Sequence, residues 1–153
     1  MTRILFCAMV WISGLTPVYG QISNAQGSMA GEVTHRSVIL QTRLTGGLTT
    51  NDVIGSEGFG RFEVSTSKAF ESSRLTEWIH ARSEYDFIVK TVVRGLMPGT
   101  RYYYRPVYGP DTSRVMTGNT GTFRTNDPEG TLPVKIAVVT GMNYDKFHHG
   151  TRN

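Results

Sequence analysis

Four polar side chains that could orient a phosphate group or support a metal ion lie close together near the carboxyl end of this 153-residue chain. They are Asn143, Asp145, His148 and His149, and they follow an apolar run at residues 134–139. Open α/β sheets bind their ligands just beyond the carboxyl ends of the strands. Amide, carboxylate and imidazole groups are suitable ligands at such a place. The loop after this run is therefore the candidate chemical site that the sequence predicts.

The same loop also has a purely structural interpretation. Tyr144 and Phe147 would then pack beneath a following helix, and the polar side chains would face solvent. The other two histidines, His35 and His80, have no acidic or histidine partner at a ligand spacing. We expect both on strands, in structural roles. The sequence contains no nucleophile-elbow pattern, no Walker motif and no dinucleotide-binding glycine motif.

The apolar run at residues 134–139 differs from the rest of the chain, because Lys135 is its only polar residue. Strands that are apolar on both faces are typical of parallel sheets covered by helices on both sides. One such strand cannot form a sheet, so we expect residues 131–153 to begin an α/β segment that stays incomplete in this chain. The alternative is an eighth strand of the preceding domain, followed by a frayed tail.

From about residue 26 to residue 125, short alternating segments are separated by Gly, Pro, Asn, Asp and Ser. This pattern favours strands and argues against helices. The predicted strands lie at residues 38–44, 62–66, 87–94 and 101–105, with a last strand around Phe123. Such short and regular spacing is typical of an antiparallel sandwich. The predicted fold class for residues 21–127 is therefore an all-β, immunoglobulin-like antiparallel sandwich.

Three local features refine this prediction. The glycine pair at residues 46–47 should stop the first strand, and a loop should follow through residue 58. Trp78 is expected in a further strand or edge segment at residues 75–82. Pro106 cannot donate a ladder hydrogen bond, so its strand should be bulged or at an edge there.

The most specific local signal is the segment at residues 96–102. Pro98 and Gly99 would make a turn, and Leu96 would plug the end of the core. Tyr102 could return its hydroxyl group to the backbone just upstream, as in a tyrosine corner. The pattern Leu-x-Pro-Gly-Thr-x-Tyr resembles the corner before strand F of fibronectin type III domains. The alternative is an ordinary turn followed by a core tyrosine.

Residues 1–20 have the features of a secretory signal peptide, with one charge at Arg3, an apolar run at residues 4–12 and a suitable cleavage site before Gln21. The run is shorter than the roughly 20 apolar residues that span a bilayer, so no stable membrane anchor is expected. The alternative is a buried N-terminal helix or strand. Cys7 is the only cysteine, so the mature chain would contain none. We therefore expect a secreted or periplasmic protein.

The net charge of +4 is scattered along the chain, without a basic run or aromatic interleaving. This distribution argues against nucleic-acid binding and favours a solvated surface.

The order of these segments resembles the N-terminal region of the alkaline phosphatase D family of metallophosphatases. The stretches that carry the resemblance are GEVT at residues 31–34, SVILQTR at 37–43, FEVSTS at 62–67, LMPGTRYYYR at 96–105, GTFRT at 121–125 and VKIAVVT at 134–140. The last of these is similar to the strand that opens the catalytic domain. The resemblance covers nearly all of the chain after the leader. It implies a fibronectin type III-like N-terminal domain at residues 21–127 and the start of a truncated metallophosphatase domain at residues 131–153.

The resemblance implies full-length relatives that hydrolyse phosphate mono- or diesters with divalent or trivalent metal ions, such as calcium and iron. It places most of their metal ligands beyond this chain. Many members have a ligating cysteine where this chain has Gly141, and glycine cannot ligate through a side chain. This departure implies altered metal chemistry or loss of that site. We expect this chain alone to bind no metal and to catalyse nothing, and its partners to be the missing catalytic domain and, in the full-length protein, a phosphate ester.

A function of a different class fits the same fold. The sandwich could be a free-standing binding or adhesion module, with an exposed aromatic strip of Trp78, Tyr103 and Tyr108 that stacks on sugars. The part of the gene after Asn153 discriminates between the two hypotheses. An acidic continuation rich in metal ligands would favour the enzyme, and a stop codon would favour the module.

Overall fold

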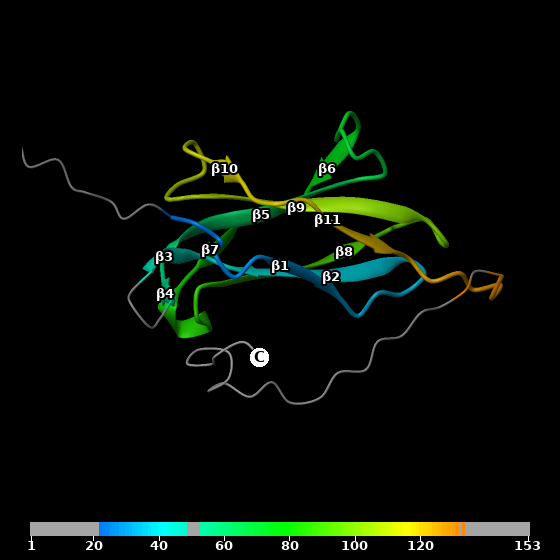
Figure 1. Cartoon of the computed structure of the whole chain (residues 1–153), viewed down its shortest axis with the longest axis horizontal. Helices are drawn as coiled ribbons and strands as arrows, with labels where there is room; N and C mark the ends of the chain where they lie inside the picture. Colours follow the sequence, from blue (N-terminus) through cyan, green and yellow to red (C-terminus); the bar gives the residue numbers. More distant parts are fainter. Residues whose placement is uncertain (1–21, 49–52, 132, 134–153) are drawn as a thin grey trace, which may run out of the picture.

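The computed structural model describes residues 22–48, 53–131 and 133, which form a sandwich of two antiparallel sheets (Figure 1). One sheet has three strands, in the order β1 (Ser28–Gly31), β2 (Ser37–Arg43) and β8 (Ile88–Arg94). The other sheet is built on β5 (Gly58–Ser65) and β9 (Arg101–Gly109), which lie side by side. All-β architecture is thereby confirmed, whereas the predicted α/β segment at residues 131–153 lies almost wholly outside the described residues.

The second sheet is completed by four short strands. They are β6 (Ser73–Leu75) and β7 (Ile79–Ala81) beside β5, and β10 (Met116–Thr117) and β11 (Gly121–Arg124) beside β9. Two further elements connect strands of different sheets. The hairpin of β3 (Thr45–Leu48) and β4 (Val53–Gly55) lies between β2 and β5 in the sequence, and a 3-10 turn, η1 (Ser83–Tyr85), lies between β7 and β8. Among the described residues there is no helix with the length and hydropathy needed to cross a bilayer.

The core lies between the two sheets and follows the predicted period of two. In β2 every second side chain is buried, and the same alternation runs through most of β5. Leu40, Phe62 and Val89 have no exposed surface, and the ring of Phe62 lies 6.3 Å from that of Tyr104 across neighbouring strands. Full burial of one such side chain contributes roughly 1.5–3 kcal/mol to folding, so this layer is the main source of stability.

The prediction of a loop from residue 46 to residue 58 was wrong, since β3 and β4 pair there. The register of the ladder shifts between Thr45 and Gly47, so Gly46 lies at a bulge. Thr45 is almost fully buried, and it exchanges both backbone hydrogen bonds with Ser23. Contacts to a residue far upstream therefore hold this hairpin, and local sequence does not reveal them.

Trp78 lies in the edge segment predicted at residues 75–82, between the short strands β6 and β7 beside β5. Trp78 itself is outside a strand, because the hydroxyl and the amide of Thr76 form hydrogen bonds with the backbone of Phe62. One further strand prediction was wrong at its start. β8 begins at Ile88 rather than at Phe87, since Asp86 and Phe87 both have positive φ, of 49° and 57°. Left-handed backbone is unusual for such residues and cannot continue a ladder.

The predicted irregularity at Pro106 is confirmed. β9 pairs Tyr104 with Gly121 and Val107 with Thr117, so residues 118–120 face only residues 105–106. This bulge marks the change of partner from β11 to β10. The Pro106 carbonyl accepts a hydrogen bond from Gly118 at 2.8 Å, so the proline nitrogen faces the same interrupted side, where no donor is required.

Candidate functional site: the corner and the exit of the chain

The segment at residues 96–102 forms a closed corner at one end of the sandwich. Leu96 is 3% exposed and plugs the core, while Pro98 and Gly99 form the turn, with Gly99 at a φ of +61°. The hydroxyl of Tyr102 accepts a hydrogen bond from the Met97 amide at 2.9 Å. This contact has the geometry of a tyrosine corner.

Phe123 and Thr125 stabilise the corner through further contacts. The ring of Tyr102 stacks on Phe123 of β11, with 5.4 Å between the ring centroids. Thr125, which is 1% exposed, accepts a hydrogen bond from the Thr100 amide at 2.9 Å and donates to the Met97 carbonyl at 2.6 Å. The role of Thr125 is not evident from local sequence, because its partners are 25 and 28 residues upstream.

The chain leaves the sandwich beside this corner, and its exit is fastened to the first hairpin. Asn126 donates from its backbone to the Thr34 carbonyl at 3.0 Å and from its side chain to the Val33 carbonyl at 3.0 Å. Val33 and Thr34 lie in the connection between β1 and β2. The exit is thus fixed to one end of the three-stranded sheet.

A tight turn comes directly after the exit. The Gly130 amide donates to the Asp127 carbonyl at 3.2 Å, and the Asp127 carboxylate accepts hydrogen bonds from the amides of Glu129 and Thr131 and from the Thr131 hydroxyl. Asp followed by Pro is a turn signal, so this turn is encoded in the local sequence.

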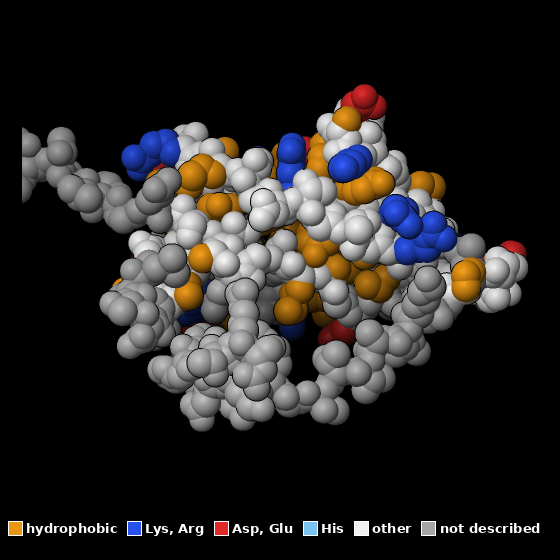
Figure 2. Space-filling view, in the orientation of Figure 1, with side chains coloured by type: hydrophobic (Ala, Val, Ile, Leu, Met, Phe, Trp, Pro, Cys, Tyr) orange, Lys and Arg blue, Asp and Glu red, His pale blue; other side chains and the backbone are white. Residues whose placement is uncertain are grey.

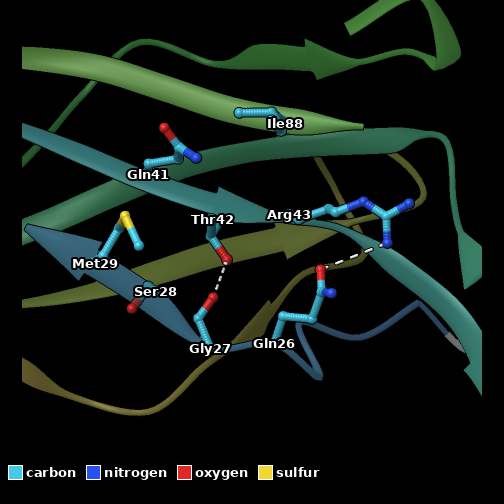
Figure 3. Close-up of a pocket in the computed structure, with 8 residues that line it drawn as sticks. All are labelled: Gln26, Gly27, Ser28, Met29, Gln41, Thr42, Arg43 and Ile88. Atoms are coloured by element: carbon cyan, nitrogen blue, oxygen red, sulfur yellow. Dashed lines mark hydrogen bonds between the residues drawn. The ribbon is translucent and has the colours of Figure 1, made fainter. Parts of the chain in front are cut away.

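A surface groove lies at the other end of the three-stranded sheet (Figure 3). Met29 and Ile88 flank Gln41 there, and the Thr42 hydroxyl donates to the Gly27 carbonyl at 2.7 Å. Arg43 closes the groove, but its guanidinium group is already engaged by Asp86 at 2.8 Å. Three polar side chains of the groove, those of Gln26, Thr42 and Arg43, are thus engaged by other residues of the protein.

On the outer face of the six-stranded sheet, arginine side chains stack on aromatic rings, and Figure 2 shows basic side chains (blue) at several separate places over this sheet. The guanidinium group of Arg61 lies 4.2 Å above the ring of Trp78, and that of Arg105 lies 4.2 Å above Phe70. Arg105 also forms an ion pair with Glu63 at 2.7 Å. Partial burial raises the pKa of Glu63, but the hydrogen bonds from Ser73 and Arg105 and the nearby positive charges outweigh it and lower the pKa below its ordinary value.

The proposed sugar-binding strip is not assembled. Tyr108 is only 6% exposed, and Trp78 is half-buried beneath Arg61. The prediction of an exposed strip was therefore wrong, because the alternation in β9 shifts after Pro106 and residues 106–109 are all buried.

The predicted histidine roles can be followed for two of the four residues. His80 lies on β7, where it stacks on Phe59 at 4.6 Å and accepts a hydrogen bond from Arg82 at 2.9 Å. His35 is exposed in the connection between β1 and β2, so its placement on a strand was wrong. The part of the chain that the structure describes contains no group of three His, Cys, Asp or Glu residues that could hold a metal ion. The predicted loop of Gly141, Asn143, Asp145, His148 and His149 lies outside that part.

The sheet order, the corner and the fastened exit define a fibronectin type III-like sandwich domain that leads into a further segment. More specifically, the chain belongs to the family of the PhoD-like phosphatase N-terminal domain, whose model matches residues 13–127. No curated protein matches the chain.

Two solved structures share the fold. The structure of PhoD superposes with a TM-score of 0.59 at 22% sequence identity and covers 77% of this chain. A fibronectin type III domain from the human KIAA0970 protein superposes with a TM-score of 0.54 at 13% identity, and the match covers 81% of this chain and 88% of that domain. The chain spans only 22% of the PhoD chain that it matches.

Proposed function

We propose that this domain is the N-terminal accessory domain of an exported, metal-dependent phosphatase or phosphodiesterase. The family match over residues 13–127 carries the proposal. In this proposal, residues 1–20 are a signal peptide that directs the protein to the periplasm or the medium. Residues 134–139 are the first strand of an α/β catalytic domain, and Asn143, Asp145, His148 and His149 lie near its substrate.

The described residues suit a supporting role better than a chemical one. Hydrolysis at a two-metal centre requires clustered carboxylate and imidazole ligands. Within residues 22–48 and 53–131 no such cluster exists, and the most strongly bonded carboxylate of the sheets, that of Glu63, is already used by Ser73 and Arg105. Calcium or iron would therefore be bound by the catalytic domain, and the sandwich would hold that domain through the fastened exit.

An assay of the 153-residue chain tests whether the chemistry resides outside it. The purified chain is incubated with 4-nitrophenyl phosphate and with bis(4-nitrophenyl) phosphate, each with added calcium or iron. We expect no hydrolysis above the blank. Metal-dependent turnover that disappears in a His148→Ala/His149→Ala double variant would contradict the proposal, because it would place a working site within this chain.

A further inference from the structure

The outer face of the three-stranded sheet carries apolar side chains that no described segment covers. Ile39 of β2 lies directly opposite Val92 of β8, and Val92 is 44% exposed. Met29 of β1, on the same face, is 60% exposed. Together with Ile88, at the groove in Figure 3, these residues lie on one face of all three strands and are called the apolar stripe; Gln41 and Lys90 lie between Ile88 and the pair of Ile39 and Val92. Exposed apolar patches rimmed by polar residues mark interaction sites.

The opposite outer face is different, because the protein covers it with its own side chains. Trp78 and Phe70, from the segments that flank β6, lie against Arg61 and Arg105. His80 of β7 stacks on Phe59 of β5 in the same way. Of the two outer faces, the one with Ile39 and Val92 is therefore the one left for a partner.

The charges on this face indicate what the partner must carry. The residues of β1, β2 and β8 include no Asp or Glu, while Lys90 and Arg94 are exposed on β8. Arg43, at the end of the central strand β2, is already paired with Asp86. A complementary partner has an apolar centre with carboxylates at its rim.

The place where the chain leaves the sandwich indicates that the partner is the part of the protein that follows Thr131. Asn126 fastens the exit to Val33 and Thr34, at the end of the three-stranded sheet. A tight turn at residues 127–130, closed by the hydrogen bond from the Gly130 amide to the Asp127 carbonyl, follows directly at this end of the sheet. Only two residues separate Thr131 from the apolar run that starts at Val134, so these two positions are at most about 10 Å apart along an extended chain. Val92 lies two residues from the end of β8, roughly 7 Å along the strand.

We propose that the stripe of Met29, Ile39, Ile88 and Val92 is the docking face for the domain that follows Thr131 and begins with the strand at residues 134–139. This inference rests on the proposed function, since it requires that domain to exist. The docked surface is an apolar patch rimmed by carboxylates, and it holds the sandwich rigidly against the catalytic domain.

Cysteine labelling tests the docking face. Val92→Cys is introduced in a Cys7→Ser background, both in the 153-residue chain and in the protein that the whole gene encodes. Thr122→Cys is the matched control, because Thr122 is exposed on the outer face of the other sheet, two residues from the end of its strand. Labelling by a maleimide is followed at each position by peptide mass spectrometry, so other cysteines do not interfere.

We expect Val92→Cys to react at least about tenfold more slowly in the longer protein than in the 153-residue chain, which corresponds to a docking free energy of about 1.4 kcal/mol or more. Thr122→Cys should react equally in both. Equal rates for Val92→Cys in an active hydrolase would overturn the docking face but leave the proposed function intact. Slow labelling already in the 153-residue chain would mean that a second copy or the chain itself covers the face, which also overturns the inference. A gene that encodes no hydrolase after Asn153 would overturn both proposals.

Discussion

Removal of the Tyr102 hydroxyl should loosen the corner without disturbing the core. In Tyr102→Phe the ring can still stack on Phe123, but the Met97 amide loses its acceptor. A hydrogen bond contributes about 1 kcal/mol net, and a partly buried donor left without a partner costs about 1–3 kcal/mol. We therefore expect a loss of about 1.5 kcal/mol in the free energy of unfolding. For a domain of this size, that loss lowers Tm by roughly 6–12 °C.

The assay is urea denaturation of the 153-residue chain, followed by circular dichroism, with thermal unfolding as a second measurement. Tyr103→Phe is the matched control, because Tyr103 is the adjacent residue of β9 and lies partly exposed on the opposite face of the sheet. It should change the unfolding free energy by less than about 0.5 kcal/mol. Equal effects of the two substitutions would refute the corner as a source of stability.

Three further predictions concern packing, pH and processing. Gly55→Ala should destabilise the fold by about 2–3 kcal/mol in urea denaturation, because a Cβ atom there would lie 1.9 Å from the ring of Phe87; an unchanged midpoint would contradict that packing. The lowered pKa of Glu63 means that its ionised form favours folding, so this contribution is present above its ordinary value of 4.5 and is lost as the pH falls below it; Glu63→Gln should reduce the acid dependence of stability between pH 5 and pH 3, and an identical pH profile would count against the ion pair. N-terminal sequencing of the exported protein should begin at Gln21, and an intact Met1 would argue against export by a cleaved leader.

Features set by local pattern could be predicted from the sequence. The alternation in β2 and β5 reveals their buried faces, because successive side chains of a strand point to opposite sides. The corner was predictable since Pro98 and Gly99 make the turn and Leu96 and Tyr102 flank it at a fixed spacing. Each of these signals lies within a few residues of the structure that it produces.

Features held by distant partners could not be predicted in the same way. The β3–β4 hairpin depends on Ser23, which pairs with Thr45 from 22 residues upstream. The left-handed turn before β8 is fixed by Arg43, which binds Asp86 from 43 residues away. The exit depends on Asn126, whose side chain binds a carbonyl 93 residues upstream. In each case the polar partner becomes evident only once the sheets are assembled.

The most direct test of the proposed role is an assay of the protein that the gene encodes from Met1 to its natural stop codon. We predict that it continues past Asn153 and hydrolyses an aryl phosphate ester, that a chelator abolishes this activity, and that the 153-residue chain shows none. A stop codon directly after Asn153, or a longer protein that hydrolyses no phosphate ester with calcium or iron, would contradict the role of this domain as part of a metallophosphatase.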